Sequence, residues 1–196
     1  MTRIAQVVRA TSETDIGLTL DLDGSGIADI STGIGFFDHM LTAFTRHSLF
    51  DLTLRVKGDT WVDDHHTVED TGIVLGEAVN KALGDKSGIN RFGSVLVPLD
   101  EALVLASVDV SGRGQLYWDV PIGPEKVGTF DTELGHEFFV GFAREAGITL
   151  HLRLVCGENA HHILEATYKA AARALREAVE IDPRVEGIPS TKGSLS

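Results

Sequence analysis

The sequence predicts an α+β fold built from two similar halves, in which two four-stranded sheets sandwich a layer of four helices. Three observations support this prediction. The string His-His-x-x-Glu occurs at His65 and again at His161, 96 positions later. A pattern of three strands, helix, strand and helix fits each half of the 196 residues. The strands alternate apolar and polar residues, so each sheet has one apolar face for helices to cover.

The first half follows from strand alternation and helical spacing. Ile16, Leu18, Leu20 and Leu22 alternate with small or polar residues, which is typical of a half-buried strand. Apolar residues three and four apart then indicate two amphipathic helices. The expected strands are residues 4–9, 16–22, 28–31 and 52–56. The expected helices are residues 36–47 and a longer one that runs from an Asp63 or Asp64 cap to residue 83.

The same order of elements restarts after a Gly-rich break. The expected strands are residues 95–99, 102–110, 116–120 and 148–155, and the expected helices are residues 131–146 and 160–179, with a loop at 121–126. Asp131 and Asn159 are expected to cap the two helices. We therefore divide the chain into a first half (1–90), a second half (91–182) and a Gly- and Ser-rich tail (183–196). A period of about 95 residues indicates a duplicated half-domain rather than a solenoid.

The composition favours a cytosolic globular protein. The net charge is −12, with 43% hydrophobic and 23% charged residues, so a surface that neutralises nucleic-acid phosphates is not expected. The N-terminal residues lack the apolar core of a signal peptide, and no run reaches 18 apolar residues, so no membrane span is expected. The single cysteine, Cys156, lies in an apolar strand-like run and is expected to fill the core in a reducing compartment.

The repeated His-His-x-x-Glu string favours a metal site. On a helix, either histidine lies about one turn from the glutamate. The two adjacent histidines point about 100° apart, because a turn takes about 3.6 residues. They cannot easily hold one ion together, and the simplest solution is two ions that each take one histidine. Imidazole and carboxylate together suit divalent first-row metals. A single histidine at a helix start would more often be a cap or a surface residue.

The repeat aligns two further histidines, one in each helix that precedes a His-His-x-x-Glu helix. The expected ligands are then His39, His65, His66, Glu69, His136, His161, His162 and Glu165. Divided between two ions, they give three histidines and one glutamate each, which leaves room for water or substrate. Because adjacent histidines diverge, we hypothesise that the sites are shared between subunits. His151 is expected to face solvent from a strand, and His47 to have a structural role at a helix end, where a cation is favoured.

Five longer strings lie at or near these residues. They are Gly35-Phe36-Phe37-Asp38-His39-Met40-Leu41, Asp64-His65-His66-Thr67-Val68-Glu69-Asp70, Ser111-Gly112-Arg113, His161-His162-Ile163-Leu164-Glu165 and Pro189-Ser190-Thr191-Lys192-Gly193. In these strings the chain resembles the imidazoleglycerol-phosphate dehydratase family, and the resemblance covers essentially the whole chain. It implies a fold of duplicated halves related to the ribosomal S5 domain 2-like superfamily. With no fused phosphatase half, the single-function form is expected.

The resemblance also implies an activity and an assembly. The reaction would be dehydration of imidazole glycerol phosphate to imidazole acetol phosphate, in histidine biosynthesis. It would use two Mn²⁺ ions per active site, in a shell of 24 identical subunits built from trimers with sites between subunits. The implied catalytic residues are Glu13, His39, His65 and His161. The implied substrate-binding residues are Glu13, Arg91, Arg113, Lys169, Ser190 and Lys192. Without the resemblance, Glu13 would be a solvated turn residue and the tail would be disordered.

Three other functions fit parts of the sequence. A metal-storage protein would explain the eight ligands but not Arg91, Arg113 or Lys192. A dinuclear metallohydrolase is the nearest enzymatic alternative, because paired ions also activate water. A nucleic-acid-binding module rests on fold analogy alone, and fold does not imply function. The residues by themselves do not fix which metal is native or which histidine joins which glutamate.

Overall fold

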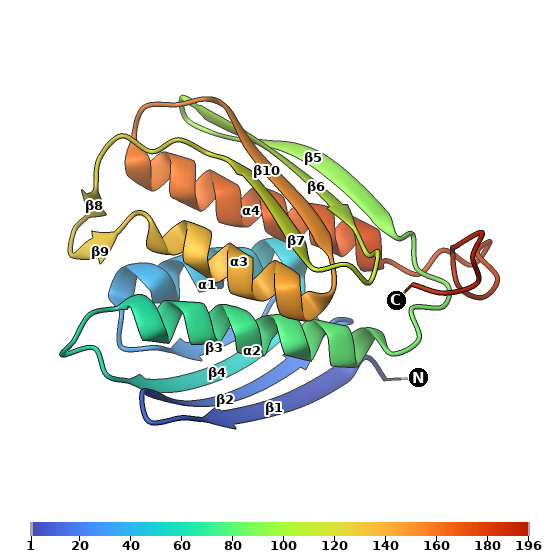
Figure 1. Ribbon diagram of the computed structural model, residues 1–196. Helices are drawn as coiled ribbons and strands as arrows, with labels where there is room; N and C mark the ends of the chain where they lie inside the picture. The colour runs from blue at the N-terminus through green and yellow to red at the C-terminus, as the bar shows by residue number, and fades with distance from the viewer. Residues whose placement is uncertain (1, 196) are drawn as a thin grey trace.

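A computed structural model describes residues 2–195 and confirms the predicted architecture. Within that part of the chain, two four-stranded sheets enclose a layer of four long helices (Figure 1). Every strand of the first sheet comes from the first half of the chain, and every strand of the second sheet comes from the second half. None of the helices in residues 2–195 has both the length and the apolar character needed to cross a membrane.

The first sheet has the strand order β1-β2-β4-β3. Its elements are β1 (Ile4–Ala10), β2 (Thr14–Asp21), β3 (Ala28–Ser31), α1 (Gly35–Ser48), β4 (Asp51–Gly58) and α2 (His65–Leu83). The pairs β1–β2 and β2–β4 are antiparallel, whereas β3–β4 is parallel. Ile16, Leu18 and Leu20 are buried on the helix-facing side of β2, as their alternation predicted.

The second sheet repeats this order as β5-β6-β10-β7. Its elements are β5 (Phe92–Leu99), β6 (Ala102–Asp109), β7 (Gln115–Asp119), α3 (Leu134–Ala146), β10 (Thr149–Cys156) and α4 (Ala160–Val179). Here too the last pair, β7–β10, is parallel while the others are antiparallel. Equal strand order, equal direction and equal placement of helices confirm the duplication.

One expected element boundary was wrong. Residues 126–131 form a small hairpin of β8 (Lys126–Val127) and β9 (Phe130–Asp131), where a loop and a helix cap were expected. Asp131 therefore lies in a strand and pairs with Lys126 at 2.7 Å. Helix α3 begins three residues later, with Glu133 at the N-cap position. A two-residue strand gives no alternation that could be recognised in the sequence.

Helices from different halves pack against each other in the central layer. Helix α2 lies along α3, and α1 lies along α4. The α2–α3 contact is close: a Cβ on Gly72 would lie 2.3 Å from the carbonyl oxygen of Phe138, and one on Gly76 would lie 2.5 Å from that of Phe142. This pairing across the halves brings His39 of α1 to Glu165 at the start of α4, and it sets α3, which carries His136, along α2.

The interior of the helix layer is rich in aromatic rings. Phe138 stacks on Phe142 and Tyr168, and meets Phe37 edge to face at 5.6 Å. Such ring pairs add about 0.5–1.5 kcal/mol each to the gain from burial. Burial also raises the pKa of the Tyr168 hydroxyl well above its usual value. This dense core fixes the ends of the helices from which the histidines project.

The expectation for the cysteine was wrong. Cys156 is exposed at the end of β10, where its Sγ lies 3.6 Å from the carbonyl oxygen of Glu101. Alternation along the strand ends before this residue, because the pairing with β6 is irregular between Leu154 and Cys156. The side chain therefore leaves the apolar face on which Leu150 and Leu152 are buried.

Candidate active site

The two His-His pairs stand in the first turns of α2 and α4. Asn159 caps α4, as predicted, and its side chain accepts hydrogen bonds from the backbone N–H groups of His161 (2.9 Å) and His162 (3.2 Å). At the start of α2, Asp63 accepts from the N–H of His65 at 2.8 Å, and Asp64 occupies the N-cap position without a side-chain cap bond. The caps fix where each helix begins, and thus how each pair points.

Three predicted ligands come together at the start of α4, two from the second half and one from the first. Glu165 Oε2 lies 3.1 Å from Nε2 of His161, one turn back on α4, and 3.3 Å from Nε2 of His39 on α1. In residues 2–195, this is the one group of three or more ligand atoms lying within 4.8 Å of one another. We call His39, His161 and Glu165 the metal triad. Two imidazoles and a carboxylate form a donor set that fits a divalent first-row ion.

Lys169 completes the surroundings of the triad. Its Nζ lies 2.7 Å from Glu165 Oε1, one turn along α4. Burial acts to raise the pKa of Glu165, but the bond and charge of Lys169, with help from His39, outweigh it and lower that pKa. Glu165 is therefore held as the anion that a cation requires.

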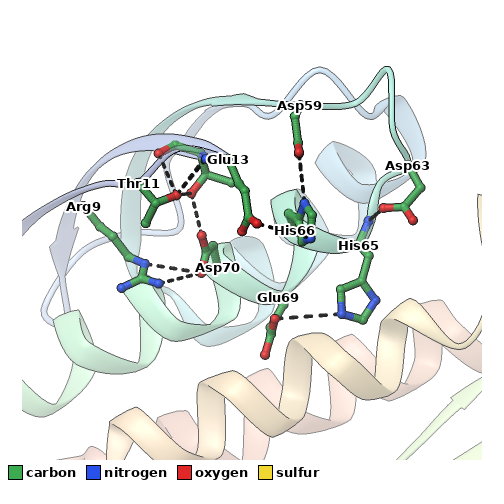
Figure 2. Close-up of polar contacts among 10 residues, drawn as sticks. Arg9, Thr11, Glu13, Asp59, Asp63, His65, His66, Glu69 and Asp70 are labelled. Carbon is green, nitrogen blue, oxygen red and sulfur yellow. Dashed lines mark hydrogen bonds and ion pairs between the residues drawn. The ribbon is translucent and has the colours of Figure 1, made fainter.

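The corresponding group at the start of α2, with His136 from α3, is open. His65 Nε2 lies 3.8 Å from Glu69 Oε2 on α2, and both side chains point toward α3 (Figure 2). His136 on α3 instead contacts Glu137, with Nδ1 to Oε1 at 2.8 Å, and packs edge-on against Trp118. The repeat thus places the right residues on facing helices, but the third ligand is turned away.

The second histidine of each pair stands apart from the triad and is held by a carboxylate. His66 Nδ1 lies 3.0 Å from Asp59 Oδ2, and His162 Nδ1 lies 2.7 Å from Glu101 Oε2. These hydrogen bonds raise the pKa of each histidine. Hydrogen bonds from the backbone of Asn159 and from His162 lower the pKa of Glu101 to about 2. Sequence reasoning singled out neither Asp59 nor Glu101. The available signal was their position at strand ends, which the repeat places beside the helix starts.

Glu13 lies beside His66, the histidine that Asp59 holds. It is half exposed in the turn between β1 and β2, and its Oε1 is 3.8 Å from His66 Nε2. Its backbone is fixed at both ends: Thr11 Oγ1 accepts from the N–H of Glu13 at 3.1 Å, and the N–H of Asp59 donates to the carbonyl of Glu13 at 3.0 Å. A carboxylate that is exposed but anchored in this way can accept a proton from a bound molecule.

A buried aspartate ties this turn to α2. Asp70 accepts from the guanidinium of Arg9 at 3.0 Å through Oδ1 (Figure 2). Its Oδ2 accepts from the hydroxyl of Thr14 at 2.5 Å. It adjoins the ligand Glu69 in sequence. Strand β1, the turn and the ligand helix are thereby held as one unit.

Four of the predicted substrate residues line one pocket. The pocket is bordered by Arg91, Ser111, Arg113, Ser190, Thr191, Lys192, Ser194 and Leu195. Arg91 donates to Asp109 at 2.8 Å and to the carbonyl of Pro189 at 3.0 Å, which fastens the tail to β5 and β6. Arg113 stays exposed, 3.6 Å from Asp109. Guanidinium, ammonium and hydroxyl groups around one hollow suit a phosphate group. We call this the phosphate pocket. Lys169, the remaining predicted cation, lies with the metal triad instead.

The metal triad and the phosphate pocket lie at opposite ends of α4. The backbone N–H of Arg91 donates to the carbonyl of Ala178, in the last turn of that helix, at 2.8 Å. His161 is in its first turn. At a rise of 1.5 Å per residue, the two points are about 25 Å apart.

The whole chain matches one family of known proteins. The family model described as imidazoleglycerol-phosphate dehydratase matches residues 32–175. The chain belongs to the imidazoleglycerol-phosphate dehydratase family. The imidazoleglycerol-phosphate dehydratase of Granulibacter bethesdensis is 60% identical over 196 residues and covers 100% of both chains. That of Thermoanaerobacter pseudethanolicus is 61% identical over 193 residues, which is 98% of this chain and 100% of the relative.

Solved structures of the family have the same fold. The imidazoleglycerol-phosphate dehydratase of Staphylococcus aureus superposes with a TM-score of 0.84 at 40% identity, covering 91% of this chain and 99% of that one. The enzyme of Pyrococcus furiosus in complex with (S)-C348 gives a TM-score of 0.83 at 39% identity, covering 96% and 100%. As an imidazoleglycerol-phosphate dehydratase the protein is a hydro-lyase that acts on a small substrate in histidine biosynthesis.

The two remaining histidines lie outside the triad. His151 is exposed on β10, as predicted, and stacks on Tyr117 with ring centroids 4.3 Å apart. His47 lies in the last turn of α1, the helix end at which a structural role was expected. Burial, followed by the charges of Lys169 and Arg173, lowers its pKa. The neutral imidazole is therefore favoured despite the helix end.

Proposed function

We propose that the protein dehydrates imidazole glycerol phosphate to imidazole acetol phosphate with two Mn²⁺ ions in each active site. The metal triad supports the first ion, because its two imidazole nitrogens and one carboxylate oxygen already lie within 4.8 Å of one another. His65, Glu69 and His136 would supply the equivalent ligands of the second ion once His136 turns from Glu137. We expect the cytoplasm as the location, where an exposed thiol such as Cys156 stays reduced.

The reaction breaks a C–O bond and a C–H bond on neighbouring carbons of the glycerol chain. Divalent ions bound at the imidazole ring would make the ring N–H acidic, and the electron-rich ring that remains after loss of this proton can expel the adjacent hydroxyl. Glu13 then accepts the proton from the middle carbon, since it is half exposed and lies 3.8 Å from His66. The resulting enol becomes the ketone product, and the hydroxyl leaves as water.

The phosphate end of the substrate would bind in the phosphate pocket. Arg113 and Lys192 can face the phosphate directly, and Ser190 can donate a hydrogen bond. Arg91 holds the tail in place through Pro189 as well as adding charge. The tail, whose residues between 190 and 195 line this pocket, would thus be part of the binding site. For a protein of net charge −12, this pocket and Lys169 concentrate positive charge where an anionic ester must bind.

The main observation in favour of an active site shared between subunits is the distance between the two ends of α4. A three-carbon chain between ring and phosphate cannot span the roughly 25 Å between the metal triad and the phosphate pocket of one chain. The triad of one subunit must therefore meet the pocket of another. Lys169, beside the triad, would then reach the phosphate from the triad's side.

The number of ligands supports the same arrangement. The metal triad provides two histidines and one glutamate, whereas the eight predicted ligands allow three histidines per ion. His162 is held by Glu101 and cannot join His161 at the same ion. The missing histidine is expected from another subunit, as His66 or His162. We expect the complete assembly to contain 24 subunits.

The deciding experiment is turnover of imidazole glycerol phosphate by metal-stripped protein with and without added Mn²⁺. We expect the ketone product only with Mn²⁺, from particles whose mass in light scattering corresponds to the 24-subunit assembly. Inorganic phosphate as product would instead indicate a metallohydrolase. Tight Mn²⁺ binding with no effect of phosphate esters and no turnover would indicate metal storage. Turnover by a single chain would exclude the shared site.

A further inference from the structure

The second histidine of each pair is oriented by a carboxylate on its Nδ1 atom. Asp59, which is buried, directly follows β4 and reaches His66 at 3.0 Å. Glu101 directly precedes β6 and reaches His162 at 2.7 Å. The Glu101 carboxylate is itself fixed, because Oε1 accepts from the N–H of Asn159 at 2.8 Å. Both imidazoles are therefore held by groups that belong to the sheets, not to their own helices.

This contact determines which nitrogen can bind a metal. An imidazole that donates its Nδ1–H to a carboxylate carries the lone pair on Nε2, and the carboxylate also fixes the ring plane. In the metal triad, His39 and His161 likewise direct Nε2 toward Glu165. All four rings thus present the same nitrogen, but those of His66 and His162 are not part of the triad. Nε2 of His66 lies 3.8 Å from Glu13, and Nε2 of His162 lies 3.5 Å from Asp100.

The two halves use different positions for the same task. Glu13 and Glu101 are equivalent, because each is the last turn residue before the second strand of its sheet. Asp59 and Glu158 are equivalent, because each comes directly after a glycine at the end of a corresponding strand. Asp59 follows Gly58 at the end of β4, and Glu158 follows Gly157, just after β10. In the first half the residue after the strand holds the histidine, which leaves Glu13 exposed. In the second half the turn residue holds it, and Glu158 is exposed.

We propose that Asp59 and Glu101 are positioning residues that aim Nε2 of His66 and His162 out of their own chain, toward metal sites completed on another subunit. Asp59 has a second task that Glu101 lacks. Its backbone N–H holds the Glu13 turn while its carboxylate holds His66, so that one residue sets the distance between the proton acceptor and a metal ligand. This inference rests on the proposed function, since it requires that the ions bind there.

The test measures Mn²⁺ binding, separately from turnover, in metal-stripped wild type and in Asp59→Ala and Glu101→Ala. Loss of such an orienting partner typically costs about 10–100-fold in metal affinity. We expect each variant to lose that much affinity at one of its two ions per chain and to keep the other. Asp59→Asn and Glu101→Gln retain an acceptor for Nδ1–H and should recover most of the affinity.

Glu158→Gln is the matched control. Glu158 is the equivalent of Asp59 in the second half, but its side chain is exposed, and Glu101 rather than Glu158 holds His162. We expect its Mn²⁺ affinity to stay within about twofold of wild type, because both rings keep their partners. A loss equal to that of Glu101→Ala would contradict the positioning role.

The outcomes separate this inference from the function on which it rests. Wild type with Mn²⁺-dependent turnover, together with unchanged Mn²⁺ affinity in both alanine variants, overturns the positioning role and leaves the proposed function intact. Wild type that binds two ions without turnover overturns the proposed function, while the affinities still decide the positioning role. Wild type that binds no Mn²⁺ overturns both.

Discussion

The two halves of the molecule share strand order and ligand strings, but the ligand group at the start of α4 is more complete than the one at the start of α2. At α4, His39 from the first half already lies beside His161 and Glu165 of the second half, with Lys169 behind the glutamate. At α2, His65 and Glu69 of the first half are in place, while His136 from the second half is turned toward Glu137. Duplication has therefore preserved the scaffold and the ligand spacing, whereas the contacts that orient each ligand have diverged.

The helix contacts differ in the same way. Gly72 and Gly76 let α2 approach the backbone of α3 closely, while Gly135 of α3 meets only side chains, chiefly that of Leu164. A backbone contact cannot relax by changing a rotamer, whereas a side-chain contact can. The α2–α3 pair, which carries the open ligand group, is thus the more rigid of the contacts compared here. The ligand group carried by this helix pair is therefore incomplete because the side chain of His136 is turned away, and not because the helices are apart.

The largest difference between the halves is expected in the loss of kcat when the two equivalent glutamates, Glu13 and Glu101, are replaced. Glu13→Gln removes the proposed proton acceptor and should lower kcat by about 10²–10⁴-fold without changing Mn²⁺ affinity. Glu101→Gln keeps an acceptor for His162 and should lower kcat by less than about tenfold. Steady-state kinetics with saturating Mn²⁺ measure both. Equal losses would mean that the two turns have the same role after all.

Metal removal is expected to reveal the difference in completeness. When Mn²⁺ is added back to stripped protein, the first ion should bind the metal triad, because its ligands need no rearrangement. His39→Ala removes a ligand and should weaken the first binding step by more than the roughly 10–100-fold that is typical for loss of a partner that only orients a ligand. His136→Ala should weaken the second step. Titrations followed by the resonance signal of unbound Mn²⁺ distinguish the two, and the reverse order would contradict the comparison.

The glycine contacts predict a difference in stability. Gly72→Ala should lower the free energy of unfolding by about 1–3 kcal/mol, since overpacking forces the backbones of α2 and α3 apart. Gly135→Ala is the control: its Cβ meets the end of the Leu164 side chain at 2.7 Å, which can move, and alanine favours the helix by about 1 kcal/mol. Denaturant melts measure both. Equal destabilisation would remove the distinction between the helix contacts.

The smallest expected effect depends on pH. At the start of β4, Asp51 accepts from the N–H groups of Ser25 and Ile27, each at 2.8 Å, and these bonds lower its pKa. The equivalent residue of β10, Thr149, uses a hydroxyl that contacts Ser111 at 3.0 Å.

A lowered folded pKa gives stability that is present above the ordinary carboxyl value of about 3.9 and is lost as pH falls through the lowered value. Asp51→Ala should therefore cost about 1 kcal/mol at pH 7 and less below pH 4. Thr149→Ala should have a cost that does not change with pH. Melts at pH 7 and pH 3 compare the two, and a constant cost for Asp51→Ala would contradict the argument.

Local pattern was enough to predict most of the fold. Strand alternation and the Asn159 cap located β2 and α4 closely, because both signals act within a few residues. The repeat located His39 through its position before α2, and the structure places it beside Glu165, 126 residues away. Longer-range contacts were not accessible in this way.

The missed features depend on neighbours that are distant in sequence. Glu101 meets His162 across 61 positions, and nothing in the Asp100-Glu101 turn marks it as an orienting group. The orientation of His136 is set by Trp118 and Glu137, which the ligand pattern does not involve. Cys156 is exposed because the β6–β10 pairing becomes irregular beside it. Each miss reflects tertiary contact and not local propensity.

The metal triad and the phosphate pocket lie at opposite ends of α4, and this has a consequence for how two mutant alleles act together in one cell. A chain with Glu165 replaced keeps a sound phosphate pocket, and a chain with Arg113 replaced keeps a sound triad. If each site joins ends from different chains, mixed particles of the two mutants contain some sites in which both ends are sound. Two alleles that each abolish growth without histidine would then restore it together, whereas two alleles damaged at the same end would not.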